Sequence, residues 1–587
     1  MWIIRVNMTD QSATVNDVPE EYKFLGGRAM TSSLVADEVP PLAHPLGPNN
    51  KLVFSPGILS GTPAPTAARL SVGAKSPLTG GIKESNAGSP WASDLGDMQI
   101  KALVVEGQPE EKGKYWGLYM TWDKVEGKPK VEFFDATEYA GKPLPDVYPQ
   151  LFERFGKKVS IAATGMAGEH RYSNSGVAFN DLESRATRYA GRGGMGSVMA
   201  SKGVKFIVLD QKGAPGTAIA DKALFDEGRK KMIEALQTHA ITKPKGTLNT
   251  YGTAALINVL NEAGGLPTRN FSSGFFEGAP KIGGEAIFDG IKERTGKETY
   301  NHGCSPGCII QCSNTWFDES GEEITSCVEY ESSWALGADC GIDNLDHIAE
   351  LIKLCNAYGF DTIETGTTIA VAMEAGVIPF GDGPGAINLV REMAKATPQG
   401  RILGSGTEGT GKAYGVIHIP TVKGQSMPAY EPRAVKGIGI TYATTPMGAD
   451  HTAGYTIAPE ILGVSGTADP LSPEGKAALS RNFQAATAFI DSSGHCLFIA
   501  FAVLDIASGY QGMIDEVNGV YGTNWTADDI AAYGVKVLKK ERAFNEAAGI
   551  GKEYDRVPEF MLYEPLPPHN QVFDVSEEAL DSVFGEL

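Results

Sequence analysis

The amino-acid sequence predicts an α+β protein in which a strand-rich N-terminal domain is followed by two helix-rich domains. At 587 residues, the chain is too long for one hydrophobic core. Short β-type runs separated by Gly, Pro and Asn or Asp turns fill its first third, and helical periodicity follows from about residue 215. We therefore expect domains over residues 1–210, 211–410 and 411–587.

The strands of the first domain are predicted from β-type runs bounded by turn residues. The N-terminal stretch "MWIIRVNMTDQ" is predicted to form an edge or first strand. The further runs are "KLVFSPGIL", "ARLSVGA", "IKALVVEG", "KVEFFDA", "VSIAATG" and "VKFIVLD".

The helices are predicted from apolar residues that recur at intervals of three and four. This pattern marks "DKALFDEGRKKMIEALQTH", "DHIAELIKLCNAYGF" and "EGKAALSRNFQAATAFIDSSG". The stretch "TIETGTTIAVAMEAG" is more uniformly apolar and predicts a buried helix, and "PFGDGPG" after it predicts a loop.

Composition narrows the class of protein. A hydrophobic fraction of 42% and a charged fraction of 21% are typical of a globular chain. The net charge of −20 argues against nucleic-acid binding, which needs a basic surface. The longest apolar run, "CLFIAFAVL", is about half the roughly 20 residues that span a bilayer, and the N-terminus lacks the features of a secretory signal. We expect a cytoplasmic location and no membrane span.

Three of the seven cysteines lie close together in "NHGCSPGCIIQCSN". On one continuous helix, Cys304 and Cys312 would be about 12 Å apart along the axis, too far to bind one small cluster. The proline and glycine after Cys304 disfavour a helix there. We therefore expect Cys308 and Cys312 to share a helix face while Cys304 reaches back from the loop.

Such a group of thiols indicates a metal site. A four-iron cluster needs four thiolates, commonly three near in sequence and one remote. The candidates for the fourth ligand are Cys327, Cys340, Cys355 and Cys496. Spacing alone leaves zinc open, and buried thiols acting as small hydrophobic side chains are the alternative.

Two glycine-rich segments are candidate phosphate-binding sites, and only the first keeps that interpretation. In "YAGRGGMGSVMASKGVKFIVLD", glycines and Arg192 precede a predicted short helix and strand, which suits a phosphate, although a tight turn explains the glycines nearly as well. A dinucleotide fingerprint needs its strand before the glycines, so it is excluded. "GTEGTGKA" nearly matches a P-loop, but Ala413 replaces the magnesium-binding hydroxyl residue. We reject an ATPase and expect a turn and the start of a helix.

Acid–base candidates lie near the predicted cluster. Glu329 and Glu331 are surrounded by apolar residues, where burial raises the pKa of a carboxyl. Asp450 and His451 share the glycine-bounded loop "GADHTAG", and the ordinary pKa of a histidine, about 6.5, suits proton transfer at neutral pH. "DSSGHC" adds Asp491, His495 and Cys496. Each alone is more often a hydrogen-bonding loop residue than a catalyst.

These motifs together resemble the aldehyde ferredoxin oxidoreductase family, tungsten or molybdenum enzymes with two pyranopterins and one four-iron cluster. The resemblance runs nearly end to end. It is carried, in order, by "IIRVNMT", "FLGGRAM", "ARLSVGAKSPLTGGIKESNAG", "AGRGGMGSVMASKGVK", "CNAYGFDTIETG", "MPAYEPRAVKGIGITYATTPMGADHTAG" and "DSSGHC". It implies that the strand-rich domain binds the pterins.

The resemblance also implies roles for individual residues. Glu331 and His451 match the acid–base residues beside the metal. The pterin-binding residues would be Arg69, Asn86, Ala190, Gly191, Arg192, Asn356, Asp361, Asp491 and His495. The backbone of Asn86 and Ala190 would help hold a magnesium ion. The cluster ligands would be Cys304, Cys308, Cys312 and Cys496.

Three departures distinguish this chain from the family pattern. Cys304 and Cys308 are one residue further apart than usual, Asn356 stands where an Asp is expected, and Ala453 replaces a basic residue that often follows the His. A different substrate, or molybdenum in place of tungsten, could follow from these changes.

The predicted function is two-electron oxidation of an aldehyde to a carboxylic acid, with electrons leaving through a 4Fe-4S cluster. The expected partners are a small-molecule substrate and ferredoxin or an iron–sulfur partner subunit, with a homodimer as one arrangement. One alternative is a reductase, or a hydroxyacid or acyl-thioester oxidoreductase, with a partner subunit. Another is a non-catalytic iron–sulfur carrier.

Overall fold

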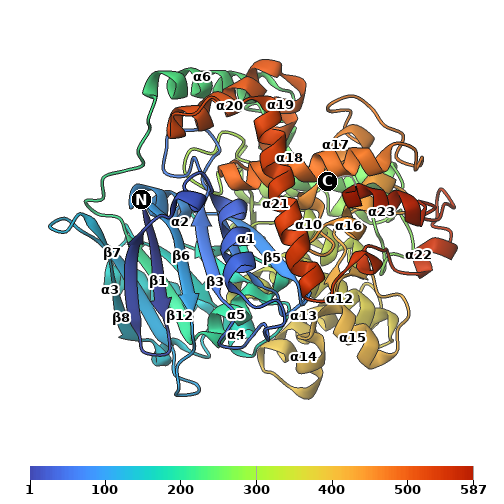
Figure 1. Ribbon diagram of the computed structural model, residues 1–587. Coiled ribbons are helices and arrows are strands. Elements are labelled where there is room, and N and C mark those ends of the chain that lie inside the picture. Colours follow the sequence, from blue (N-terminus) through green and yellow to red (C-terminus); the bar gives the residue numbers. More distant parts are fainter. Residues whose placement is uncertain (299–300, 586–587) are drawn as a thin grey trace.

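The computed structural model describes residues 1–298 and 301–585 and confirms the predicted fold class. Two β-sheets form the N-terminal part, and helices form most of the rest of the chain (Figure 1). The first sheet has the strand order β2-β1-β6-β3-β4-β5 and the second β11-β10-β9-β12-β7-β8. The strand β1 lies between two neighbours, so it is the first strand of the chain but not an edge.

The strands of the two sheets include each of the runs predicted from the sequence. Their bounds are β1 (Trp2–Asn7), β2 (Ser12–Asp17), β3 (Leu52–Pro56), β4 (Arg69–Lys75), β5 (Ile82–Gly88), β6 (Ile100–Glu106), β7 (Trp116–Asp123), β8 (Lys128–Asp135), β9 (Ser160–Thr164), β10 (Val177–Asn180), β11 (Ala186–Ala190) and β12 (Val204–Asp210). Two short hairpins follow, β13 (Thr315–Phe317) with β14 (Glu323–Ser326) and β15 (Thr421–Val422) with β16 (Gln425–Ser426).

The two sheets share one apolar core. Side chains of both sheets belong to a single buried cluster, together with the helices α2 (Trp91–Asp97) and α5 (Met195–Ser201). Trp91 lies between the sheets: its ring centroid is 5.2 Å from that of Phe54 in β3 and 5.6 Å from that of Phe179 in β10. Burial of such large rings stabilises the packing of one sheet on the other.

The glycine-rich segment departs from its prediction in one respect. The strand β11 ends at Ala190, directly before Gly191, so the ground on which a dinucleotide fingerprint was excluded, that no strand precedes the glycines, is wrong. The exclusion now rests on topology: β11 pairs antiparallel with β10 and is separated from β12 by two strands, whereas that fingerprint needs a βαβ unit. The sequence missed β11 because polar residues interrupt its short run. Gly193 and Gly194 have φ of +82° and +78°, a region open to glycine, and turn the chain from β11 into α5.

The helical part confirms the predicted helices. The remaining helices of the N-terminal part are α1 (Gly27–Glu38), α3 (Leu144–Phe155) and α4 (Met166–Glu169). Those that follow are α6 (Lys222–Thr238), α7 (Thr247–Tyr251), α8 (Leu256–Glu262), α9 (Gly284–Thr295), α10 (Tyr330–Ala335), α11 (Leu345–Tyr358), α12 (Thr362–Glu374), α13 (Gly383–Ala394), α14 (Pro398–Leu403), α15 (Gly406–Tyr414), α16 (Lys436–Thr444), α17 (Ile457–Glu460), α18 (Lys476–Ser493), α19 (Ala500–Asp505), α20 (Ala507–Tyr521), α21 (Ala527–Ala547), α22 (Phe560–Tyr563) and α23 (Glu577–Gly585).

Individual helices agree with their sequence patterns. The predicted buried helix is α12, whose residues are buried almost throughout. The segment that nearly matches a P-loop is α15, a helix that begins at Gly406. The predicted loop at 379–385 is shorter than expected because α13 already begins at Gly383. Among the described residues, no single helix has the length and apolar character to cross a membrane, although α18 and the segment Leu497–Asp505 would qualify as a pair bent by 120°.

The cysteine segment is not helical, which corrects the expectation that Cys308 and Cys312 share a helix face. Residues 303–312 form an irregular loop closed by a β-bridge between His302 and Ser313. Gly307 and Gln311 have φ of +72° and +50°, which a right-handed helix cannot accommodate. The chain therefore wraps around the thiols instead of presenting them from one helix.

Two segments far apart in sequence pair through their backbones. The N–H of Arg69 donates to the carbonyl of Gly494 at 2.9 Å, and other residues of 57–69 make similar bonds to 492–496. The approach is so close that a Cβ on Gly57 would lie 2.0 Å from the Cα of Gly494. Glycine is therefore required at this crossing.

A buried ion pair makes a second contact between the N-terminal part and the C-terminal helices. Figure 1 shows α1 and α21 side by side against the first sheet. Arg28 of α1 donates to both carboxylate oxygens of Glu541 in α21, at 2.9 and 2.8 Å, and lies 3.3 Å from Asp491 in α18. The Arg28 and Glu541 side chains are 1% and 0% exposed, so neither charge is solvated by water.

We expect Arg28→Met to lower the free energy of unfolding by about 3–5 kcal/mol, because it leaves the buried Glu541 carboxylate unpaired. The measurement is the midpoint of urea unfolding. A matched control exists between the same two helices, where Lys540 of α21 contacts Asp37 of α1 at 2.8 Å with both side chains about one-third exposed. Lys540→Met should change stability by less than about 1 kcal/mol. Equal losses in both variants would contradict this account.

Candidate functional site

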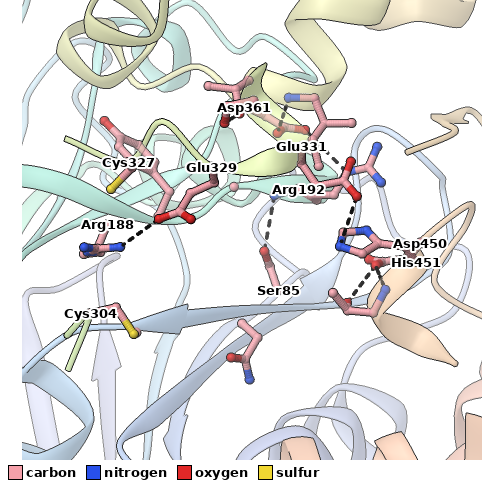
Figure 2. A pocket seen from close by; sticks show the side chains of 18 of the residues that line it. Ser85, Arg188, Arg192, Cys304, Cys327, Glu329, Glu331, Asp361, Asp450 and His451 are labelled. Atoms are coloured by element: carbon pink, nitrogen blue, oxygen red, sulfur yellow. Dashed lines mark hydrogen bonds and ion pairs between the residues drawn. The ribbon is translucent and has the colours of Figure 1, made fainter. Parts of the chain in front are cut away.

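The predicted site residues converge on one polar cavity of about 350 Å³. It lies where the edge strands β5 and β11 of the two sheets meet the helical part, as Figure 2 shows. We call it the polar cavity. The predicted site residues that line it are Arg69, Asn86, Gly191, Arg192, Cys304, Glu331, Asn356, Asp361, His451 and Asp491.

A neighbouring space of about 250 Å³, which we call the thiol chamber, adjoins the polar cavity. Cys304, Glu331 and His451 line both spaces, whereas Cys312 and Cys496 line only the chamber. The two spaces therefore connect the acid–base candidates with three of the predicted cluster ligands.

Thr66 brings the fourth cysteine to the other three. Its N–H donates to the carbonyl of Gly307 at 2.9 Å, and its hydroxyl accepts from the N–H of Ile309 at 3.1 Å. Its carbonyl accepts from the N–H of Cys496 at 2.9 Å. Thr66 has φ of +56°, unusual for a β-branched residue, which indicates that these contacts hold it in a strained conformation.

The four thiols interact with one another. A hydrogen bond from Cys308, with the nearby guanidinium groups of Arg69 and Arg188, lowers the pKa of Cys304 well below its usual value. Burial raises the pKa of Cys312 and Cys496. Over the described parts of the chain, no three His, Cys, Asp or Glu side chains are arranged to hold a single metal ion.

Arg69 connects the cysteines to the polar cavity. Its Nε donates to the side-chain oxygen of Asn86 at 2.5 Å, and its Nη1 lies 3.9 Å from the sulfur of Cys304. Gly88 at the end of β5 leaves room for this contact, because a Cβ there would lie 2.7 Å from the same sulfur.

Arg192, at the start of the glycine segment, is fixed by hydrogen bonds and by a nearby carboxylate. Its guanidinium donates to the carbonyls of Ala449 and Ser426, at 2.9 and 2.7 Å, and its Nε lies 3.5 Å from Asp361. Asp361 caps α12 by accepting from two of its N–H groups, and burial raises the pKa of its carboxyl. The predicted phosphate-binding arginine thus also joins the glycine segment to the helical part.

A buried ion pair fixes the loop that carries the histidine. Lys83 of β5 contacts Asp450 at 2.9 Å, with the Lys83 side chain fully buried. Burial alone would raise the pKa of the Asp450 carboxyl, but Lys83 and Arg192 hold it well below its usual range. Asp450 is therefore charged at neutral pH and in turn caps the short turn that begins at His451.

Glu331 and His451 lie side by side in the wall of the polar cavity, with their side chains in contact, as Figure 2 shows. Oε1 of Glu331 lies 3.3 Å from Nε2 of His451, while Oε2 accepts from the N–H of Ala429 at 3.0 Å. Burial raises the pKa of Glu331 to about 8 and lowers that of His451 to about 4. The ordinary histidine pKa expected from the sequence is therefore wrong, and both side chains are neutral at neutral pH.

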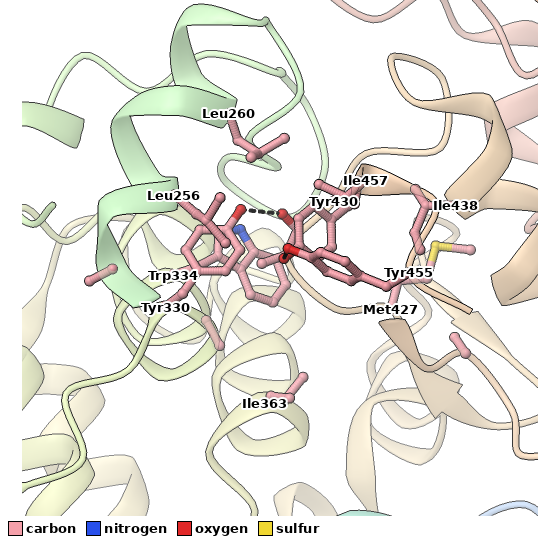
Figure 3. Close-up of a cluster of buried hydrophobic side chains, with 14 of the residues drawn as sticks. Leu256, Leu260, Tyr330, Trp334, Ile363, Met427, Tyr430, Ile438, Tyr455 and Ile457 are labelled. Atoms are coloured by element: carbon pink, nitrogen blue, oxygen red, sulfur yellow. Dashed lines mark hydrogen bonds between the residues drawn. The ribbon is translucent and has the colours of Figure 1, made fainter. Parts of the chain in front are cut away.

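Aromatic rings form the wall behind this pair. Tyr430 and Tyr455 share a hydrogen bond of 2.8 Å between their hydroxyls, and their ring centroids lie 5.8 and 6.4 Å from that of His451. Figure 3 shows both tyrosines in a buried cluster with Tyr330 and Trp334. These rings limit the directions in which water can reach His451.

Some predicted residues lie elsewhere. Ala190 is buried at the end of β11 and lines neither the polar cavity nor the thiol chamber. Cys308 also lines neither space. His495 faces away: its ring nitrogens lie 3.0 Å from the hydroxyl of Ser493 and 3.2 Å from a carboxylate oxygen of Glu516.

Among the residues that line the polar cavity, Glu84 and Arg188 were not predicted from the sequence, and Cys327 was predicted only as one of four candidates for the fourth cluster ligand. Arg188 donates to the hydroxyl of Ser313 at 2.8 Å, which is itself bonded to Glu329. Glu84 lies on the edge strand β5 and Arg188 on the edge strand β11. Neither strand was among the predicted runs, so the only signal for these two residues was their position within or beside the family motifs.

The polar atoms that remain unpaired show what the site would accept. Among the described residues that line the polar cavity, Nε of Arg188 and Arg192, Oε1 of Glu331 and Nδ1 of His451 are buried without a hydrogen-bond partner. Buried polar groups are normally paired. Cationic donors beside a glycine turn suit phosphate groups, and four neighbouring thiols suit an iron–sulfur cluster. The residues present therefore fit a phosphate-bearing pterin cofactor and a cluster.

Comparison with known proteins assigns both parts of the chain. The family model "Aldehyde ferredoxin oxidoreductase, N-terminal domain" matches residues 3–211, and "Aldehyde ferredoxin oxidoreductase, domains 2 & 3" matches residues 227–586. The chain is 36% identical to a tungsten-containing aldehyde ferredoxin oxidoreductase of Pyrococcus abyssi, covering 96% of this chain and 92% of the relative.

One more distant relative matches in sequence and one solved structure matches in fold. The chain is 24% identical to the aliphatic sulfonate oxidoreductase, WOR-like subunit, of Pyrococcus furiosus, over 96% of this chain and 89% of that protein. The solved active site complex BamBC of benzoyl coenzyme A reductase superposes with a TM-score of 0.77 at 17% identity, covering 99% of this chain and 92% of that chain.

We expect Cys496→Ser to lose most of the visible iron–sulfur absorbance and to lower the iron content, because it removes one thiolate of the predicted cluster. Cys355→Ser is the control, since Cys355 is a fully buried thiol in α11 that lines neither space. It should keep its iron. Equal loss in the two variants would show that buried thiols act only through folding.

Proposed function

The chain belongs to the aldehyde ferredoxin oxidoreductase family, and we propose that it oxidises an aldehyde to the carboxylic acid at a tungsten centre in the polar cavity. The balanced reaction converts one aldehyde and one water into one carboxylic acid, two electrons and two protons. The observation that carries the proposal is the buried pair of Glu331 and His451, 3.3 Å apart, which lines the same chamber as the thiols.

The cofactor, when bound, supplies the two-electron redox chemistry, with tungsten, or molybdenum in its place, held by two pyranopterins. In this proposal the chain supplies residues that hold the cofactor and the ions around it. Those for the pterins are Arg69, Asn86, Gly191, Arg192, Asn356, Asp361 and Asp491, and the backbone of Asn86 and Ala190 would hold magnesium. The four cysteines would hold one 4Fe-4S cluster.

Glu331 and His451 serve as the proton-carrying donor and the proton acceptor of the proposed reaction. At neutral pH Glu331 carries a proton, and because its Oε2 accepts from the N–H of Ala429, that proton belongs on Oε1. It can therefore donate a hydrogen bond to the carbonyl oxygen of the aldehyde. The imidazole of His451 is neutral and can accept a proton from the water that is consumed.

Cys304 marks the route by which electrons leave. Its thiol lies within reach of Arg69 and lines both the polar cavity and the thiol chamber. Together with Cys308, Cys312 and Cys496, it would hold a 4Fe-4S cluster, which would supply one-electron transfer toward an external carrier. Ferredoxin, named in the description of the relatives, or an iron–sulfur partner subunit is the proposed acceptor.

The test is metal and pterin analysis of protein purified without oxygen, followed by aldehyde-dependent reduction of a viologen dye. We expect tungsten or molybdenum, pterin and about four iron atoms per chain. Iron without pterin would instead support the non-catalytic carrier.

We expect His451→Ala and Glu331→Gln each to lower turnover by about 10²- to 10⁴-fold while iron, pterin and tungsten or molybdenum stay bound. The double variant should be little slower than either single variant, because the donor and the acceptor act together in one step, the addition of water to the aldehyde. The measurement is dye reduction under saturating aldehyde. Multiplied losses in the double variant would show that they act separately.

Turnover should also depend on pH in a defined direction. The proton on Glu331 is present below its pKa of about 8, and His451 is neutral above its pKa of about 4. We expect a plateau between these values and a fall of about tenfold per pH unit above pH 8. Glu331→Gln should abolish the alkaline fall in the residual activity. An unchanged alkaline limb in that variant would assign the pKa to another group.

A further inference from the structure

A further cavity, lined by none of the residues assigned above to the cofactors or the protons, lies among the helices α18, α19, α20 and α21. Its volume is about 410 Å³, within the range of about 300–1,000 Å³ that is typical of small-molecule sites. We call it the apolar cavity. Its lining is mainly aliphatic and aromatic, including Phe483, Phe489, Phe501, Met513 and Ile530. Close-packed interiors seldom leave an opening of this size, so an apolar occupant is indicated.

The inner end of the apolar cavity reaches the reaction site. Tyr455, Leu497 and Phe498 line both it and the thiol chamber. The ring of Tyr455 lies 6.4 Å from that of His451 on one side and 6.2 Å from that of Phe501 on the other. One aromatic side chain therefore separates the predicted proton acceptor from the apolar cavity.

The outer end of the apolar cavity opens to solvent. Ala486 of α18, Leu504 of α19 and Ala531 of α21 line it and are exposed, Leu504 by 37%. Arg481 is the one charged side chain among the described residues that line this cavity. A long uncharged molecule can enter here and extend inward to the tyrosine.

We propose that the apolar cavity binds the hydrocarbon part of the substrate, so that this enzyme prefers aldehydes with a medium-length alkyl chain to short or charged ones. The inference rests on the proposed function, since it names the substrate class of the same site. The aldehyde carbon lies beside His451, where the polar cavity meets the thiol chamber, and the alkyl chain passes Tyr455 into the apolar cavity. Each methylene that leaves water favours binding by the ordinary hydrophobic effect.

The first test is the specificity of the wild-type enzyme for straight-chain aldehydes from acetaldehyde to octanal. We expect kcat/KM to rise by about fourfold per methylene until the cavity is filled, the ratio that corresponds to burial of one CH₂ group. Succinic semialdehyde, which ends in a carboxylate, should be a poor substrate. A flat or falling series would overturn the proposal.

The second test compares two exposed alanines that are adjacent on α21. Ala531 lines the mouth of the apolar cavity, whereas Ala532 does not line it, and both are exposed. Ala531→Trp should lower kcat/KM for octanal at least tenfold and change the value for acetaldehyde less than twofold. Ala532→Trp should match the wild type with both. Equal effects of the two substitutions would overturn the proposal.

Binding of the product acid separates this inference from the proposed function. Calorimetry on the purified, cofactor-containing protein should detect octanoate binding in the wild type and in Ala532→Trp, and at least tenfold weaker binding in Ala531→Trp. If no aldehyde is oxidised but octanoate binds in this pattern, the proposed function fails and the cavity assignment stands. If aldehydes are oxidised but octanoate binds no better than acetate, the cavity assignment fails alone.

Discussion

The site depends on one backbone contact, the pairing of residues 57–69 with residues 492–496. A glycine on each segment lets the two segments approach closely, and Thr66 of the first segment is held in a strained conformation. This single crossing brings Cys496 to the loop of the other three cysteines. It also places Arg69, at the start of a sheet strand, beside the thiols. The strand-rich part, the loop of residues 303–312 and the last helices thus build the site together, although no one part contains all four cysteines.

The charge state of each buried ionisable group around the site depends on whether the group has an oppositely charged partner. Lys83 with Asp450 and Arg28 with Glu541 are buried pairs, and both fix elements of the wall. Glu331 and His451 are buried without full pairing, and burial therefore moves both pKa values toward the neutral forms. A low-dielectric pocket penalises an isolated charge far more than a paired one. Burial in the low-dielectric interior therefore has two effects: the charges of the scaffold have to be paired, and Glu331 and His451, which are expected to move protons, are kept neutral.

Much of the fold could be read from local patterns, whereas the site could be read only in part. Apolar runs predicted the central strands, and three- and four-residue periodicity predicted helices such as α6, α11 and α18. The edge strand β5 escaped because Lys83 and Glu84 are buried charges, which strand propensities disfavour and only long-range partners explain. The helix expected at Cys308 was wrong, since the φ values of that loop are set by tertiary contacts. The family resemblance, not the spacing, selected Cys496 among the remote cysteines.

The long separation between Cys304 and Cys496 has a consequence for how the protein is made. About 190 residues lie between them, so a ribosome that adds about 5–20 residues per second needs roughly 10–40 s to synthesise this part of the chain. During that interval the nascent chain carries Cys304, Cys308 and Cys312 but not Cys496. Residues 57–69 also still lack residues 492–496, the segment with which they pair. If the four thiols hold a cluster as proposed, its insertion can be completed only after the segment that carries Cys496 has been synthesised.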